Sequence, residues 1–240
     1  MTLQTHPVFL YSLIPALAML LGSLAASIRK PGPKWTSATQ HFAAGVVFAA
    51  VALELLPKIE GDSWWTIGVG FLLGILVMLG VGALSERLED EENPKRGLPL
   101  GLLTAVGIDN VIDGLLLGIA FLAGTQGGIL IAIALTFEIL FLGLSVSSTM
   151  SERGYGFPAR LGWGLLLSLA VPVGALLGYW ALSRLPANWE AEFIAFGVAA
   201  LLFLVTEELL KEAHKKKDTP WITATFFLGF LVILLLKNRI

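Results

Sequence analysis

The 240-residue chain has no cysteine and few charged residues. The absence of cysteine excludes disulfides, thiolate metal sites and cysteine nucleophiles together. Only 14% of the residues are charged, whereas an ordinary soluble domain carries about 25%. The net charge of −2 comes without a basic patch, so the composition gives no indication of nucleic-acid binding. A soluble globular protein is therefore not expected.

Apolar sequence dominates the chain instead, since 56% of the residues are hydrophobic and the mean hydropathy is +0.80. A helix of ~20 residues crosses the hydrocarbon core of a bilayer, and turn signals divide the apolar sequence into eight such stretches. The pattern predicts an all-α, polytopic membrane helix bundle, with a single transmembrane domain over residues 1–240. No Lys or Arg precedes the first stretch, which therefore lacks the positive flank of a cleavable signal peptide and should be retained. The expected spans are approximately 8–28, 37–57, 64–84, 98–122, 127–150, 160–183, 191–213 and 220–237.

The basic residues predict the orientation, because Lys and Arg are retained on the cytoplasmic side of a membrane. Twelve of the 16 basic residues fall in the connections that follow spans 1, 3, 5 and 7. The four on the opposite side are Lys58, Arg184, Lys237 and Arg239. We therefore expect both termini on the extracytoplasmic side of the cell (inner or plasma) membrane, with the lipid bilayer as the surrounding partner.

Acidic residues inside the predicted spans are the main functional signal, because a carboxylate at mid-membrane costs ~2.5–3.5 kcal/mol on insertion scales. Asp109 and Asp113 are four residues apart in span 4, on one helical face, with Asn110 beside them. Glu138 in span 5 and Asp109 are each expected about 16 Å deep, counted from opposite membrane faces. These four side chains, Asp109, Asn110, Asp113 and Glu138, are therefore predicted to converge near the midplane.

Three acids at one depth repel one another unless a cation or shared protons compensate. A cation site is the simplest interpretation, and protonated or mutually hydrogen-bonded carboxyls that hold helices together are the alternative. An intramembrane aspartyl protease would use two Asp residues as an acid–base pair. Its aspartates come from different helices, whereas Asp109 and Asp113 are one turn apart, so an enzyme is not expected.

Three further acids lie late in spans, namely Glu54 in span 2 and Glu207 with Glu208 in span 7. Each group is followed by two leucines, and the two spans run in opposite directions. Such antiparallel similarity is the mark of an inverted repeat that relates spans 1–3 to spans 6–8. In an alternating-access cycle Glu54 would be an entry carboxylate, and Glu207 or Glu208 an exit one. Snorkelling of these acids to headgroups is the alternative.

The residues around the acids resemble a known family. The sequence Asp109-Asn110-Val111-Ile112-Asp113-Gly114 resembles the fourth helix of ZIP (ZRT/IRT-like) divalent-metal transporters, whose motif is His-Asn-x-Pro-Glu-Gly. Residues 137–143 lie where the fifth helix of the family carries His-Glu-x-Pro-Glu-x-Gly. Supporting matches cover 45–57, 169–178 and 206–214. The resemblance implies eight spans in a 3+2+3 inverted-repeat arrangement, and spans 4 and 5 that carry the ion in an elevator-like or rocking motion.

The departures from the family pattern predict one ion site instead of two. The histidine of the fourth helix is Asp109 here, and the residues peculiar to a second ion are replaced by Phe141 and Val171. The remaining donors are all oxygens, which suit Mg, Mn or Fe(II) better than Zn. The transported ion is expected among Mn, Fe, Mg, Zn and Cd, and no resident cofactor is expected.

Two hypotheses follow for the function. The first is a transporter that moves a divalent cation toward the cytoplasm by alternating access through the mid-membrane site. The second is a ZIP-like membrane protein that has lost metal transport and has a structural or regulatory role, or that transports another cation. GxxxG patterns such as 70–74 and 174–178 predict close helix contacts. They are compatible with a homodimer but do not specifically predict one.

Overall fold

The computed structural model describes residues 7–28, 32–90, 97–184, 186, 189–214 and 219–239, and within them it is helical and contains no strand. Eight helical segments are long and apolar enough to cross a membrane, as the sequence predicts. The second begins at Pro33 instead of 37, because proline favours the first helical turn, and the third ends at Asp90 instead of 84. The elements are α1 (Pro7–Ile28), α2 (Pro33–Ala50), η1 (Val51–Leu55), η2 (Leu56–Lys58), α3 (Trp64–Asp90), α4 (Leu100–Ala123), α5 (Thr125–Glu152), α6 (Phe157–Ser168), α7 (Ala170–Leu182), α8 (Glu190–Phe203), η4 (Leu204–Leu209), α9 (Leu210–Ala213) and α10 (Pro220–Lys237).

The second and seventh spans each contain a π-helical segment that hydropathy does not reveal. In the second span it is η1, which continues α2, and in the seventh it is η4, which joins α8 to α9. Pro57 explains the first, because proline lacks the N–H that would bond to the Leu53 carbonyl in an α-helix. The Leu53 carbonyl accepts a hydrogen bond from the Lys237 ammonium instead. Both π-helical segments contain the acids singled out in the sequence, Glu54 in η1 and Glu207 with Glu208 in η4.

The sixth span is interrupted at Leu169, which separates α6 from α7. Pro172 lies one turn later, where its ring clashes with the carbonyl four residues earlier and its missing N–H leaves that carbonyl without a helical partner. The side chain of Asn110 on α4 donates a hydrogen bond of 3.0 Å to the Leu167 carbonyl. A backbone acceptor beside the interruption therefore contacts one residue of the predicted site.

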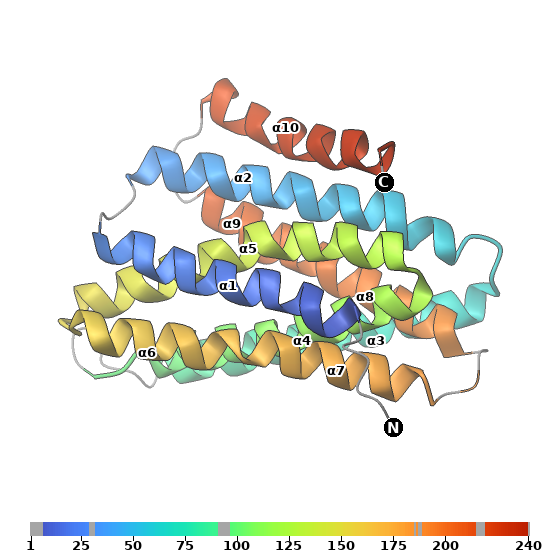
Figure 1. The fold of residues 1–240 in the computed structure, drawn as a ribbon, viewed down its shortest axis with the longest axis horizontal. Helices are drawn as coiled ribbons and strands as arrows, with labels where there is room; N and C mark the ends of the chain where they lie inside the picture. The colour runs from blue at the N-terminus through green and yellow to red at the C-terminus, as the bar shows by residue number, and fades with distance from the viewer. Residues whose placement is uncertain are drawn as a thin grey trace.

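The helices lie side by side, with α10 next to α2 at one edge (Figure 1), and their contacts divide them into two groups. In the first group α1 packs mainly against α5, and α4 mainly against α7. In the second group α2 packs mainly against α10, and α3 mainly against α8. The groups meet where α2 contacts α5 and where α3 contacts α4. The expected 3+2+3 arrangement separates spans 4 and 5 from spans 1–3 and spans 6–8. The observed contacts instead place α4 and α5 in one group with α1, α6 and α7.

Glycine residues allow the helices of both groups to approach one another closely. A Cβ atom on Gly22 of α1 would lie 2.0 Å from the Leu140 carbonyl oxygen of α5, and one on Gly114 of α4 would lie 2.3 Å from the Val171 carbonyl oxygen of α7. On the other side, a Cβ atom on Gly45 of α2 would lie 1.9 Å from a backbone oxygen of α10. No larger residue fits at these crossings, in keeping with the small residues that close helix contacts in membranes require.

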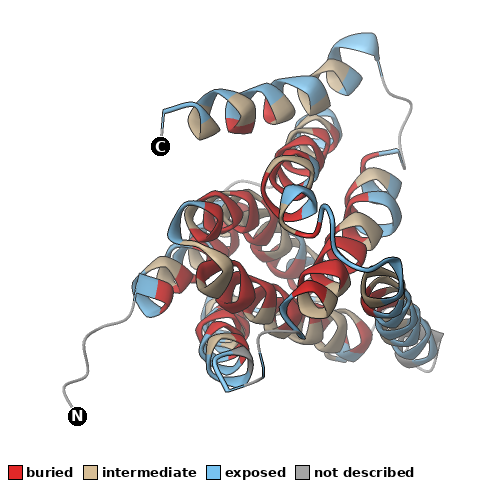
Figure 2. Cartoon of the chain, turned by 90° about the vertical axis from the view of Figure 1, so that its right-hand side faces the viewer, coloured by how far each residue is buried: buried red, intermediate tan, exposed pale blue. Residues whose placement is uncertain are grey.

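The buried residues lie on the faces that the helices turn toward one another (Figure 2). The outer faces of α3 and α10 carry large exposed apolar side chains, among them Leu72, Leu76 and Trp221. An apolar surface of this extent is unfavourable in water and suits the hydrocarbon of a bilayer. The fold is therefore that of a multi-pass membrane protein.

Candidate metal centre

Three acids from two adjacent helices meet inside the first group of helices. One carboxylate oxygen each of Asp109, Asp113 and Glu138 can be chosen so that all three lie within 4.8 Å of one another. Asp109 and Asp113 lie on α4 and Glu138 lies on α5, and all three are buried. The convergence expected from helical spacing and depth is thus present in the structure. Their role as metal ligands stays a prediction.

The acids have no compensation from the described part of the protein. Neither carboxylate oxygen of Asp109, Asp113 or Glu138 has a hydrogen-bond partner among the described residues. A buried ionised carboxylate without a partner is strongly unfavourable. The cluster therefore requires protons or a bound cation, and mutual hydrogen bonds between the carboxyls are not formed in this structure.

The amide nitrogen of Asn110 makes the hydrogen bonds that hold this side chain, and the amide oxygen stays available as an acceptor or ligand. The Nδ2 atom donates to the Leu167 carbonyl at 3.0 Å and to the Met19 sulfur at 3.4 Å. The Oδ1 atom is buried and has no partner among the described residues. Sequence spacing predicts Asn110 beside the acids but does not reveal Met19 or Leu167.

A close crossing of α4 and α7 positions the aspartates. Gly114 follows Asp113 directly, and its Cα lies against the backbone of α7. Gly174 of α7 returns the contact, because its Cβ would lie 2.3 Å from the Val111 carbonyl oxygen. The segment that carries both aspartates is therefore fixed by backbone contact with its neighbour.

Aromatic and aliphatic side chains occupy the positions where the family pattern has further polar groups. Phe137 packs on Phe42 of α2 with ring centroids 5.1 Å apart, and Val171 is fully buried. Phe141 is half-buried one turn from Glu138. These three positions therefore add no oxygen donor to the four residues of the predicted site.

Glu54 is buried on η1 and already paired. Its Oε1 lies 3.1 Å from the Lys237 ammonium, which also bonds the Leu53 carbonyl. Its other oxygen and the Lys58 ammonium both lie against Gly127 at the start of α5. The expected role of Glu54 as an entry carboxylate stays a prediction, and sequence analysis missed its partner Lys237. A basic residue at the end of an apolar span was the available signal.

Glu207 and Glu208 are both exposed side chains on η4. Glu208 repels the three acids of the cluster electrostatically. Of the two candidate exit residues, Glu208 is thus placed to act on the cluster. Neither Glu54 nor Glu207 belongs to the group of acids within 4.8 Å of one another.

The fold and the buried acids define the class as a multi-pass helical membrane protein with an acidic cluster in its interior. Comparison with known proteins identifies the family. The profile described as ZIP zinc transporter matches residues 98–237, which include the cluster. The chain therefore belongs to the ZIP family, and its function is metal transport across a membrane.

Relatives from several bacteria match most of the chain. The zinc transporter ZupT of Corynebacterium aurimucosum is 27% identical, with 81% of this chain and 82% of that protein covered. The zinc transporter ZupT of Streptococcus mutans is 26% identical, with 86% and 87% covered. The zinc transporter ZupT of Stenotrophomonas maltophilia is 28% identical, with 85% and 84% covered. The match extends over nearly the full length of the transporters.

Proposed function

We propose that the protein moves a divalent metal cation through a single site formed by Asp109, Asn110, Asp113 and Glu138. The main observation behind this proposal is that three buried carboxylates converge and have no hydrogen-bond partners among the described residues. A divalent cation would compensate their charge, and the free oxygen of Asn110 would add a neutral donor. Membership of a metal-transport family supports this over a structural role for the acids.

The donor set favours hard or borderline cations. Carboxylate and amide oxygens suit Mg, Mn and Fe(II), whereas Zn prefers imidazole and thiolate. Zn and Cd stay in the proposed range because the similar proteins are named zinc transporters. Phe141 and Val171 offer no donor, so one ion per chain is proposed.

The proposed direction is toward the cytoplasm, with both termini outside. The position of the termini is supported by the partition of basic residues, of which Arg29, Lys30, Lys95, Arg96, Lys215, Lys216 and Lys217 lie outside the described residues. We propose alternating access as the mechanism, with Glu54 on the entry side and Glu208 on the exit side.

Uptake into liposomes tests the site. We expect Asp109→Asn, Asp113→Asn and Glu138→Gln each to reduce uptake of the preferred ion at least tenfold. Each substitution removes the negative charge of one ligand while it keeps the shape of the side chain. Glu60→Gln in an exposed connection is the matched control and should transport like the wild type. Uptake should be compared for Mg, Mn, Fe(II), Co, Zn and Cd. Wild-type rates in all three site variants at equal expression would refute the assignment.

The pH dependence of binding gives a separate check. Metal binding requires deprotonated carboxylates, so protons compete with the ion. The apparent affinity for the ion should fall as pH decreases, and calorimetry across a pH series measures it. An affinity independent of pH would show that carboxylates are not the ligands.

A further inference from the structure

Lys237 at the end of α10 lies against two oxygens of η1, outside the carboxylate cluster. Its ammonium lies 3.1 Å from the Glu54 Oε1 atom and donates a hydrogen bond to the Leu53 carbonyl. The Glu54 side chain is 8% exposed, whereas that of Lys237 is 36% exposed. A cation of the chain itself is therefore bound by η1, and the solvent reaches this cation far more than it reaches the carboxylate.

The two oxygens of η1 both need a partner. A buried ionised carboxylate is unfavourable unless a cation or hydrogen bonds compensate it. The Leu53 carbonyl would accept from the N–H of residue 57 in an α-helix, but residue 57 is a proline. Lys237 is the cation of the described residues that meets both oxygens. A carboxylate and a backbone carbonyl are also oxygen donors that divalent cations accept as ligands.

The geometry of the ion pair allows the Lys237 side chain to leave. The ammonium lies within ion-pair distance of Glu54 but outside hydrogen-bond geometry, since Oε1 has no hydrogen-bond partner among the described residues. The backbone at the end of α10 is held separately, because the Gln126 side chain of α5 donates to the Lys237 carbonyl at 3.5 Å. The flexible stem of a lysine can then move its ammonium into water while the helix stays in place.

We propose that Lys237 is a tethered competitor of the cargo cation, which occupies the two oxygens of η1 until the ion displaces it. The proposal rests on the proposed function for the entry role of Glu54. A tethered group acts at an effective concentration in the millimolar range, so a dilute ion must compete with it. A divalent ion is attracted twice as strongly as an ammonium at equal distance and can displace it. Lys237 thereby sets the ion concentration at which uptake is half-saturated.

Lys58 keeps a second positive charge beside Glu54 when Lys237 leaves. A Cβ atom on Gly127 of α5 would lie 2.9 Å from the Lys58 ammonium and 3.3 Å from the Glu54 Oε2 atom, so both groups border this residue. The Lys58 ammonium is buried and has no hydrogen-bond partner among the described residues. A divalent ion on Glu54 is repelled by Lys58, which weakens its binding there and favours its passage onward.

Uptake of Mn²⁺ into liposomes at mildly alkaline pH, where protons do not take the place of Lys237, tests the competition. Lys237→Met removes the ammonium and should lower the half-saturating Mn²⁺ concentration at least threefold. A purely structural role would lower the maximal rate through loss of folded protein and leave the half-saturating concentration unchanged, which would overturn the proposal. Arg239→Gln removes an exposed cation at the same end of the chain. It is the matched control and should leave the half-saturating concentration unchanged.

A double variant shows whether the effect depends on Glu54. In the Glu54→Gln background, Lys237→Met should no longer change the half-saturating concentration, because the charge for which the two cations compete is gone. An equal shift with and without the Glu54 carboxylate would mean that Lys237 acts only through the general charge of the surface. That result would also overturn the proposal.

Reductive methylation measures the displacement without any substitution. The wild-type chain in nanodiscs is treated with formaldehyde and a mild borohydride reductant, and mass spectrometry quantifies the modification of each lysine. We expect saturating Mn²⁺ to raise the methylation rate of Lys237 at least threefold, because an ammonium released from its ion pair loses its proton more readily and is more accessible. Lys34, exposed on α2, is the reference and should react equally with and without the ion.

The variant with Asp109→Asn, Asp113→Asn and Glu138→Gln separates this proposal from the proposed function. Lys237 should still respond to Mn²⁺ in this variant, because the competition takes place at Glu54. No response in the wild type, or a response that is lost together with the carboxylate cluster, would overturn the role of Lys237 even if the cluster variants abolish uptake. Normal uptake by the cluster variants would instead refute the proposed transport site and leave the response of Lys237 intact.

Discussion

Lys237 forms an ion pair with the buried carboxylate of Glu54. The carboxylate lies on a π-helical segment whose geometry follows from Pro57, and the ammonium bonds both the carboxylate and the Leu53 carbonyl. Under the proposed entry role of Glu54, a metal ion would have to compete with Lys237. The ion pair also joins α10 to η1.

Removal of Lys237 should destabilise the protein more than removal of both partners. Lys237→Met leaves the buried Glu54 carboxylate without its partner, and we expect a loss of ~1–3 kcal/mol in the free energy of unfolding. The double variant Lys237→Met with Glu54→Gln should recover most of that loss, because a neutral amide costs less to bury. Thermal unfolding in detergent measures both. Equal melting temperatures for wild type and Lys237→Met would show that the ion pair contributes nothing.

The individual site residues differ in how far sequence predicted them. Asp109, Asp113 and Asn110 follow from helical spacing, and Glu138 follows from a count of depth along the next span. The contacts of Asn110 with Met19 and Leu167 could not be predicted, because they depend on how α1 and α6 pack on α4.

The π-helical segments relate two elements that are far apart in the sequence. The acids of η1 and η4 were already similar in sequence, and the structure adds that both segments depart from α-helical geometry at these acids. The packing has the same correspondence: α2 pairs with α10 and the seventh span pairs with α3, while α1 pairs with α5 and α7 with α4. The proposed inverted repeat relates the pair of spans 2 and 8 to the pair of spans 7 and 3, and the pair of spans 1 and 5 to the pair of spans 6 and 4. Hydropathy could not predict the pairs because it records only how apolar each span is.

The glycine contacts between α4 and α7 should be critical to the fold of the site. Gly114→Ala places a Cβ atom 2.3 Å from the Val171 carbonyl oxygen, so the two helices must separate. Overpacking of this kind costs ~1–3 kcal/mol, and we expect a lower melting temperature together with weaker metal binding. Gly162→Ala on α6 meets no atom within 4 Å and is the control, with an unchanged or slightly higher melting temperature. Equal stability of the two variants would contradict the close crossing.

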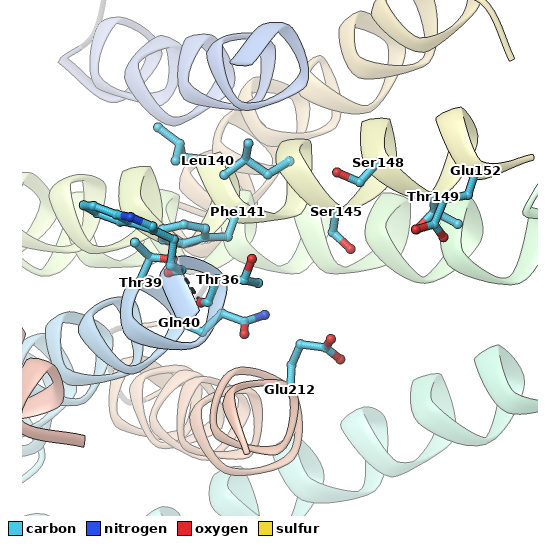
Figure 3. A pocket seen from close by; sticks show the side chains of 12 residues that line it. Thr36, Thr39, Gln40, Leu140, Phe141, Ser145, Ser148, Thr149, Glu152 and Glu212 are labelled. Atoms are coloured by element: carbon cyan, nitrogen blue, oxygen red, sulfur yellow. Dashed lines mark hydrogen bonds between the residues drawn. The ribbon is translucent and has the colours of Figure 1, made fainter. Parts of the chain in front are cut away.

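At the scale of the whole molecule, the carboxylate cluster and the cavity of about 390 Å³ lined by α2, α5 and α9 (Figure 3) have different positions relative to the two groups of helices. Both aspartates and Glu138 belong to the first group, whereas the cavity has one wall from each group. A movement of one group against the other would therefore change the cavity while the carboxylate cluster stays together. This arrangement favours alternating access in which α4 and α5 move with α1, α6 and α7, instead of a movement of α4 and α5 alone.

Alternating access predicts reciprocal exposure of the two ends of the pathway. In this structure Glu208 is exposed and Glu54 is 6% exposed, so a cysteine at position 208 should react with an impermeant maleimide from the cytoplasmic side and one at position 54 should not. The chain has no native cysteine, so each single variant reports one position. When the ion or the pH is changed, reactivity at one position should fall as that at the other rises.

Ser151→Cys and Asp62→Cys, both in exposed positions, are the controls. The first should react from the inside and the second from the outside under all conditions. Labelling of Ser151→Cys from outside would reverse the proposed orientation. If positions 54 and 208 are equally reactive under every condition, a continuous pathway is present and alternating access must be abandoned.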